Sequence, residues 1–295
     1  MLLSRRAALT LIDCKRRRHT HEPFGCDLGG VGAGGEWGAR GDWGEGGEEY
    51  GGEGTWEDTE LPFVVLLAFS GLREALTATG YNRRVDECCS AAASLLAATG
   101  AAEEAAEEAA EAGRLDAGNE EAATSKGAGA SSSGGGGGAN GPSSGEGEAS
   151  VLLSDVTREA FEAHGNSLPD NERKRAAHYF GETSRVVAGV AAWRRGDLVQ
   201  LGALMTASGI SSIDNYECGC GPMDSLRAIV AETPGVFGAR FSGAGFRGCI
   251  VALAAPEHAA TAAAAIRVKY ASSHPELAQC ADVVITRVGA GARFH

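Results

Sequence analysis

Three glycines in a short turn, Gly243, Gly245 and Gly248, are the residues whose type and spacing first suggest chemistry. Glycine has no Cβ, so backbone N–H groups can gather around an anion, or another backbone can approach closely. Apolar runs flank the turn and predict two antiparallel strands, at residues 237–241 and 250–253. This composition is typical of a phosphate-binding loop.

Two other interpretations of the same glycines must be weighed. They fit the pattern G-x-G-x-x-G, which in dinucleotide-binding proteins needs a helix directly after the glycines and an acidic residue about 20 positions later. A β-like run follows here instead, which argues against a dinucleotide site. A tight hairpin with a purely structural role stays open on the pattern alone.

A second group of chemically capable residues is His178, Glu182 and Arg185, spaced four and three positions apart. On a helix these three side chains meet on one face. A catalytic base is conceivable there, but we interpret the group as a structural ion network, because nothing nearby in the sequence completes a mechanism. Downstream, a polar stretch could line a binding site or supply caps and turns, with Ser208, Ser211, Ser212, Asp214 and Glu217 as its members.

Metal-ligand spacing is not evident in the sequence. The eight cysteines form no C-x-x-C pair, and His19 with His21 supplies too few ligands, so we expect no metal site. Buried free thiols in a reducing compartment are the simplest interpretation of the cysteines. We therefore expect a cytoplasmic protein.

Periodicity predicts the elements that must position these residues. Strands are expected at 7–12, 63–69 and 282–288, and helices at 83–98, 154–164 (with Ser154 as N-cap), 172–195, 197–207, 222–232 and 256–271. The late order β-β-α-β predicts an α+β fold with helices on one face of an antiparallel sheet.

The net charge of −13 over 295 residues comes from two low-complexity stretches, 27–60 and 99–150. Both are expected to be disordered inserts, although residues 101–112 have the composition of a solvated helix. The rest of the chain is slightly basic, and the overall acidity argues against nucleic-acid binding. No apolar run reaches the ~18 residues that would cross a membrane.

The glycine-rich stretch, Gly238-Ala-Arg-Phe-Ser-Gly-Ala-Gly-Phe-Arg-Gly-Cys249, resembles the third conserved motif of the GHMP kinases (galactokinase, homoserine kinase, mevalonate kinase and phosphomevalonate kinase). Its residues are most similar to those of galactokinases and plant-type galacturonokinases. The arginine at position 247 resembles the residue that the galacturonokinase branch has there. Three further segments look like galactokinase segments: 69–88, 174–186 and 204–218.

The resemblance implies a fold and a set of ligands. Residues 1–80 would be a remnant of the N-terminal kinase domain, and residues 81–295 a ferredoxin-like C-terminal domain with added helices. The ligands would be ATP, Mg²⁺ and a sugar or sugar acid phosphorylated at its anomeric hydroxyl. Phosphate-loop support would come from Arg240, Ser242, Gly243, Ala244 and Gly245.

The sugar side would involve Tyr81, Arg83 and Arg247. Tyr81 occupies the place of a family tyrosine that hydrogen-bonds the sugar, although a tyrosine can also order a turn. An arginine fork suits a sugar carboxylate, and surface salt bridging is the alternative for Arg83 and Arg247.

Two family features do not occur among the 295 residues: the main Gly/Ser-rich phosphate loop and the catalytic Asp of a Gly-Met-Asp-Gln type motif. We expect both upstream of Met1 and assign no catalytic residue here. The alternative to a kinase is a non-catalytic fragment or regulator that binds a sugar or a nucleotide.

Overall fold

The computed structural model describes residues 8–13, 18–23, 61–73, 80–117 and 151–288. The chain divides into two compact units, residues 1–84 with 177–295, and residues 85–176. The expected domain boundary at residues 80 and 81 lies close to one edge of the first unit and stays a prediction.

The first unit contains a four-stranded sheet of order β4-β5-β3-β6, in which all neighbours are antiparallel. Its strands are β3 (Val64–Phe69), β4 (Val236–Phe241), β5 (Cys249–Ala254) and β6 (Asp282–Thr286). The predicted hairpin is confirmed, because β4 pairs with β5 and Phe241 lies opposite Ile250. No helix begins in the connection at 242–248, which removes the dinucleotide interpretation.

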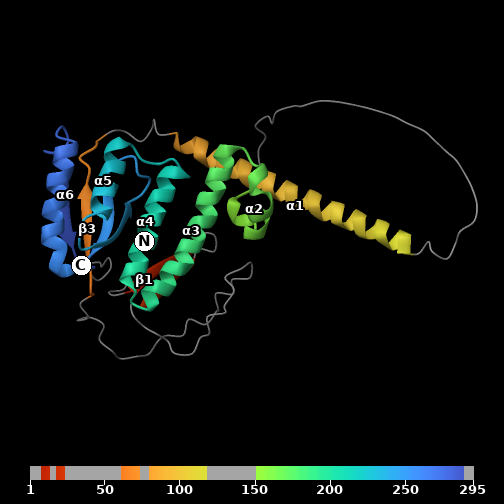
Figure 1. Ribbon diagram of the computed structural model, residues 1–295, viewed down its shortest axis with the longest axis horizontal. Coiled ribbons are helices and arrows are strands. Elements are labelled where there is room, and N and C mark those ends of the chain that lie inside the picture. Colours follow the sequence, from red (N-terminus) through yellow and green to blue (C-terminus); the bar gives the residue numbers. More distant parts are fainter. Residues whose placement is uncertain (1–7, 14–17, 24–60, 74–79, 118–150, 289–295) are drawn as a thin grey trace, which may run out of the picture. The chain divides into compact units, whose positions relative to one another are not determined.

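Alternate residues of β3 face opposite sides of this sheet, as a strand requires. Val64, Leu66 and Ala68 join a core with helices α5 (Gly221–Ala231) and α6 (Ala259–Ser273), which lie beside the sheet in Figure 1. Val65 packs on the other side, against a cluster that includes Trp193 and Leu198. Helices therefore contact both faces of the sheet, whereas the sequence had predicted one covered face.

Two helices supply residues to the cluster on this second face: α3 (Asp170–Arg194) and α4 (Leu198–Asp214). Gly196, with a positive φ of 69°, follows the end of the first helix, which was expected at residue 195. The second runs seven residues beyond its expected end at residue 207. The serines at 208, 211 and 212 are therefore helical and do not form turns.

The second unit is helical. Its elements are α1 from residue 85 onward (Tyr81–Ala117 in full), a 3₁₀ turn η3 (Leu153–Asp155), α2 (Arg158–His164), a 3₁₀ turn η4 (Gly165–Ser167) and the first turns of α3. Thr157 caps α2 by accepting a hydrogen bond from the Ala160 N–H, so the expected cap at Ser154 is wrong. Arg175, with 1% of its side chain exposed, donates to Glu87 at 2.6 Å.

The low-complexity stretch expected to be disordered from residue 99 is helical as far as Ala117. Alanine and glutamate are strong helix formers, which accounts for this continuation. The rest of that stretch, 118–150, and the whole of the acidic stretch 27–60 lie outside the described residues. The N-terminal strand β1 (Ala8–Asp13) is confirmed and pairs with an unpredicted strand, β2 (Arg18–Pro23).

Candidate phosphate loop and sugar site

The tip of the glycine-rich loop is open to an incoming group. Gly243 has a φ of +88°, which side chains rarely adopt, and a Cβ placed there would meet no other atom within 4 Å. Gly245 is buried, and a Cβ on it would come within 2.6 Å of the Phe241 ring. Both positions therefore require glycine, the first for its backbone angle and the second also for lack of space. Ser242 and Ala244 are exposed beside Gly243.

The two ends of the loop are fixed by backbone bonds. The Ser242 N–H donates to the Cys249 carbonyl at 3.0 Å, which closes the hairpin. The fully buried Ser70 donates to the Gly248 carbonyl twice, from its N–H at 2.9 Å and from its hydroxyl at 3.1 Å. The Tyr270 hydroxyl in turn donates to the Ser70 carbonyl at 3.1 Å.

Tyr270 is well suited to a permanent donor role. Burial raises the pKa of its hydroxyl to about 12, so the proton stays in place at physiological pH. The loop is thus held at its base and presents a free tip.

The middle of the loop contacts the start of α1. The Arg84 guanidinium lies 5.5 Å from the centre of the Phe246 ring, within the range of a cation–π interaction. The Cys220 thiol donates to the Phe246 carbonyl at 3.5 Å, so this residue is held from two sides. The start of α1 and the glycine-rich loop, more than 160 positions apart in the sequence, therefore meet here. A site shared by residues 81–83 and the loop requires such a contact.

The helical group around His178 joins three elements. Glu182 accepts from Arg185 at 2.6 Å and from the Ser208 hydroxyl at 2.7 Å, and Arg240 of β4 lies 4.0 Å away. His178 Nδ1 lies 3.0 Å from the Ser211 hydroxyl.

The electrostatics of this group fit the structural interpretation. Burial would raise the pKa of Glu182, but the hydrogen bonds from Ser208 and Arg185 outweigh it and lower the pKa. Burial also lowers the pKa of His178, although the Glu182 charge opposes the shift. An ionised glutamate beside a neutral histidine, both bonded to helix α4, ties α3 and α4 together.

Asp224 is a carboxylate that the sequence analysis had not singled out. It lies in the first turn of α5, against Gly219, where a Cβ would overlap its Oδ1 atom. Burial raises the pKa of this carboxyl, and Oδ1 has no hydrogen-bond partner among the described residues. Gly219 (φ +110°) is therefore required both for its backbone angle and for the approach of this side chain.

The structure places the four predicted site residues Tyr81, Arg83, Arg240 and Arg247 differently. Arg83 and Arg247 are exposed, one in the first turn of α1 and the other in the loop. Tyr81 is the first residue of α1, and its side chain lies outside the described part of the chain. Arg240 lies 4.0 Å from Glu182 of α3, and its expected contact with ATP stays a prediction.

Sequence reasoning missed Arg84 and Ser70. Arg84 shares a helix face with the buried residues Ala91, Ala92 and Leu95, spaced seven, eight and eleven positions ahead. That spacing could have shown that Arg84, and not Arg83, is buried. For Ser70 no comparable signal exists, because its partner Gly248 lies 178 positions away.

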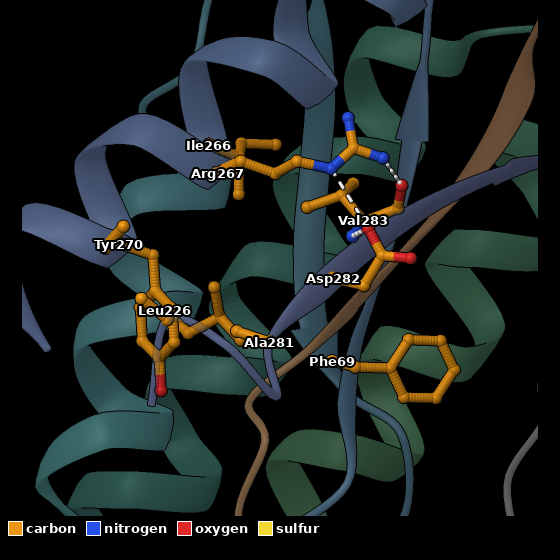
Figure 2. A pocket seen from close by; sticks show the side chains of 10 residues that line it. Phe69, Leu226, Ile266, Arg267, Tyr270, Ala281, Asp282 and Val283 are labelled. Carbon is orange, nitrogen blue, oxygen red and sulfur yellow. Dashed lines mark hydrogen bonds and ion pairs between the residues drawn. The ribbon is translucent and has the colours of Figure 1, made fainter. Parts of the chain in front are cut away.

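A cavity of about 140 Å³ lies elsewhere, between α6, β3 and β6 (Figure 2). Most of its wall is apolar, including Phe69, Leu226 and Ile266. Arg267 is paired with Asp282 at 3.0 Å on its wall, so its charge is already satisfied. None of the predicted site residues lines this cavity, and its chemistry does not suit a phosphate.

No group of three or more His, Cys, Asp or Glu side chains is placed to hold a metal ion within the described ranges. The same ranges contain no helix that is long and apolar enough to cross a membrane.

Comparison with known proteins gives the family. Residues 190–272, which include α4, α5, the glycine-rich loop and nearly all of α6, match the family model described as GHMP kinases C terminal. The chain is a GHMP kinase homologue. Over 241 residues, or 80% of its length, it is 39% identical to the galacturonokinase of Arabidopsis thaliana. Over 101 residues, or 34% of its length, it is 40% identical to the galactokinase of Bos taurus.

A solved structure supports the fold of this GHMP kinase homologue. The galactokinase of Lactococcus lactis, complexed with galactose, superposes with a TM-score of 0.61 at 19% identity, over 98% of this chain and 53% of that one. The α+β fold is therefore that of a GHMP kinase. The chain covers 46% of the Arabidopsis relative and 26% of the bovine one, so it spans about half or less of the curated relatives it matches.

Proposed function

We propose that this chain is part of an ATP-dependent sugar 1-kinase of the galacturonokinase or galactokinase type. The observation that most supports this is the glycine-rich loop, which has fixed ends, an open tip at Gly243 and a place inside the matched family domain. Phosphoryl transfer depends mainly on positioning and on electrostatic stabilisation of the phosphates, and a glycine-rich loop that is held at both ends suits that task.

In the proposed reaction the anomeric hydroxyl of a hexose or hexuronic acid attacks the γ-phosphorus of ATP. A new P–O bond forms, the bond to ADP breaks, and the hydroxyl proton passes to a base that we assign to no residue of this chain. Backbone N–H groups at 243–245 would face the phosphates. No described cluster fits Mg²⁺, so we expect the ion to arrive on the phosphates of ATP.

The first test is whether the loop responds to the proposed ligands. Adding Mg·ATP with galacturonate to the 295-residue chain, at about 10 mM and so above typical KM values, should slow amide exchange at 242–248. The cavity beside α6 serves as the internal control, and exchange at 266–271 should not change. Protection confined to other segments, with none in the loop, would remove the proposal.

Discrimination between sugars is expected to depend on the exposed arginines. A carboxylate is best bound by an arginine fork, and Arg83 and Arg247 are the candidates near Tyr81 and the loop. A chimaera in which this chain replaces the aligned part of the Arabidopsis galacturonokinase would allow the measurement. Changing Arg247 to Met should lower kcat/KM for galacturonate about tenfold or more, as loss of a charge-assisted bond implies, with a smaller loss for galactose.

If Arg247→Met and Arg83→Met each lower kcat/KM equally for galacturonate and galactose, neither arginine binds the sugar carboxylate. Arg195→Met is the matched control, because Arg195 is 53% exposed and lies in the turn directly after α3. It should leave both rates unchanged.

A non-catalytic role is the second candidate. It is favoured by the lack, among these 295 residues, of a Gly/Ser-rich phosphate loop and of a Gly-Met-Asp-Gln type motif. A binding protein of this kind would retain sugar or nucleotide and release no product. Ligand binding without turnover, both in the chain and in a folded chimaera, would favour this role over the kinase.

A further inference from the structure

Arg84 is the most unusual polar residue near the loop. Only 5% of it is exposed, although it stands next to the exposed Arg83 in the first turn of α1. A buried guanidinium must be hydrogen-bonded, because its desolvation costs several kcal/mol otherwise. Its bonds therefore indicate what the burial achieves.

Three backbone carbonyls accept hydrogen bonds from Arg84. They belong to Gly80 (3.1 Å, from one terminal nitrogen), Tyr216 (2.7 Å, from Nε) and Glu217 (from the other terminal nitrogen). The same guanidinium lies over the Phe246 ring, 5.5 Å from its centre. One side chain thus touches the entry to α1, the turn after α4 and the glycine-rich loop.

The turn at 216–217 depends on this contact. Glu217 has a φ of +55°, and it is the single non-glycine residue with positive φ in the described ranges. Such a conformation is strained and persists when the surroundings hold it. Arg84 donates hydrogen bonds to the carbonyl of Tyr216, which precedes Glu217, and to the carbonyl of Glu217 itself. The backbone of Glu217 is therefore held at both ends.

We propose that Arg84 is a positioning residue that sets the glycine-rich loop against the start of α1. This rests on the proposed function, since Tyr81, between Gly80 and Arg84, is the expected sugar contact and the loop is the expected phosphate contact. Arg84 touches neither ligand in this account. It fixes the distance between the sugar side and the phosphate side of the site.

Amide hydrogen exchange of the ligand-free chain tests the positioning directly. In Arg84→Met, exchange at 216–219 and 243–248 should become about tenfold faster or more, because hydrogen bonds to a charged group are lost. Exchange in α6 and β6 should stay as in the wild type. Arg84→Lys should lie between the two, since an ammonium can donate but cannot provide the planar fork.

Arg195→Met should leave loop exchange unchanged. Unchanged loop exchange in Arg84→Met, or an equal increase throughout the first unit, would overturn the proposal. If Arg84→Met does not fold, Phe246→Leu decides: faster exchange at 243–248 with 216–219 unchanged supports the proposal, and no change overturns it.

Turnover in the chimaera separates this inference from the proposed function. Arg84→Met should reduce the rates with galacturonate and galactose by the same factor, and Arg84→Lys should restore part of both. A loosened loop with wild-type rates would overturn the positioning role. An inactive wild-type chimaera would instead contradict the proposed function, and the exchange result would stand on its own.

Discussion

Replacing Gly202 with alanine should lower the melting temperature of the protein by roughly 6 to 12 °C, which corresponds to about 3 kcal/mol of overpacking in a chain of this size. Gly202 of α4 and Gly238 of β4 bring the two backbones into direct contact. A Cβ on Gly202 would overlap the carbonyl oxygen of Phe237, and one on Gly238 would overlap the carbonyl of Gly202. Neither backbone can move without separating the helix from the sheet.

Gly189→Ala is the matched control for this prediction. Gly189 also lies inside a helix, α3, but a Cβ there would meet only Leu201 at an ordinary 3.7 Å. Alanine is the better helix former, so this variant should keep or raise stability by up to about 1 kcal/mol. Thermal unfolding followed by circular dichroism measures both. If Gly202→Ala has the same melting temperature as the wild type, the close contact between α4 and β4 is wrong.

The sequence predicted the strands and helices in which apolar residues recur with a clear period. The strands around residues 63–69 and on both sides of the glycines, and the helix at 172–195, follow from apolar periodicity and were found. Local spacing also indicated that His178, Glu182 and Arg185 share a helix face, and the structure confirms the bond between Glu182 and Arg185.

Other features depend on partners that the local sequence does not show. The strand β2 is mostly polar, Arg-His-Thr-His-Glu-Pro, and owes its extended form to pairing with β1. Two hydrogen-bond acceptors of Arg84, the carbonyls of Tyr216 and Glu217, lie more than 130 positions away in the sequence. The coverage of both sheet faces depends on α4 crossing β4 at two glycines, and a glycine within a strand indicates only that something approaches closely.

The family resemblance supplied what physical reasoning from the residues did not. A glycine hairpin is consistent with a purely structural turn, and its interpretation as a phosphate loop came from the wording of residues 238–249. The structure adds that the loop has fixed ends and an open tip. Binding of a phosphate there remains the proposal to be tested.

The measurement that tests the central claim most directly is product formation by the chimaera, followed by ³¹P NMR with Mg·ATP and either galacturonate or galactose. The chimaera should convert ATP and one of these sugars into ADP and a sugar 1-phosphate. The 295-residue chain by itself should give no product above background. Its sequence contains neither the family's main phosphate loop nor its catalytic Asp motif, and these supply most of the positioning and electrostatic stabilisation in phosphoryl transfer.

Two results would contradict this account. A chimaera that is folded by circular dichroism, melts cooperatively and yet phosphorylates neither sugar would show that this chain cannot serve as part of a sugar kinase. Robust ATP-dependent phosphorylation by the 295-residue chain alone would show that the active site lies elsewhere in it than at the glycine-rich loop and the start of α1.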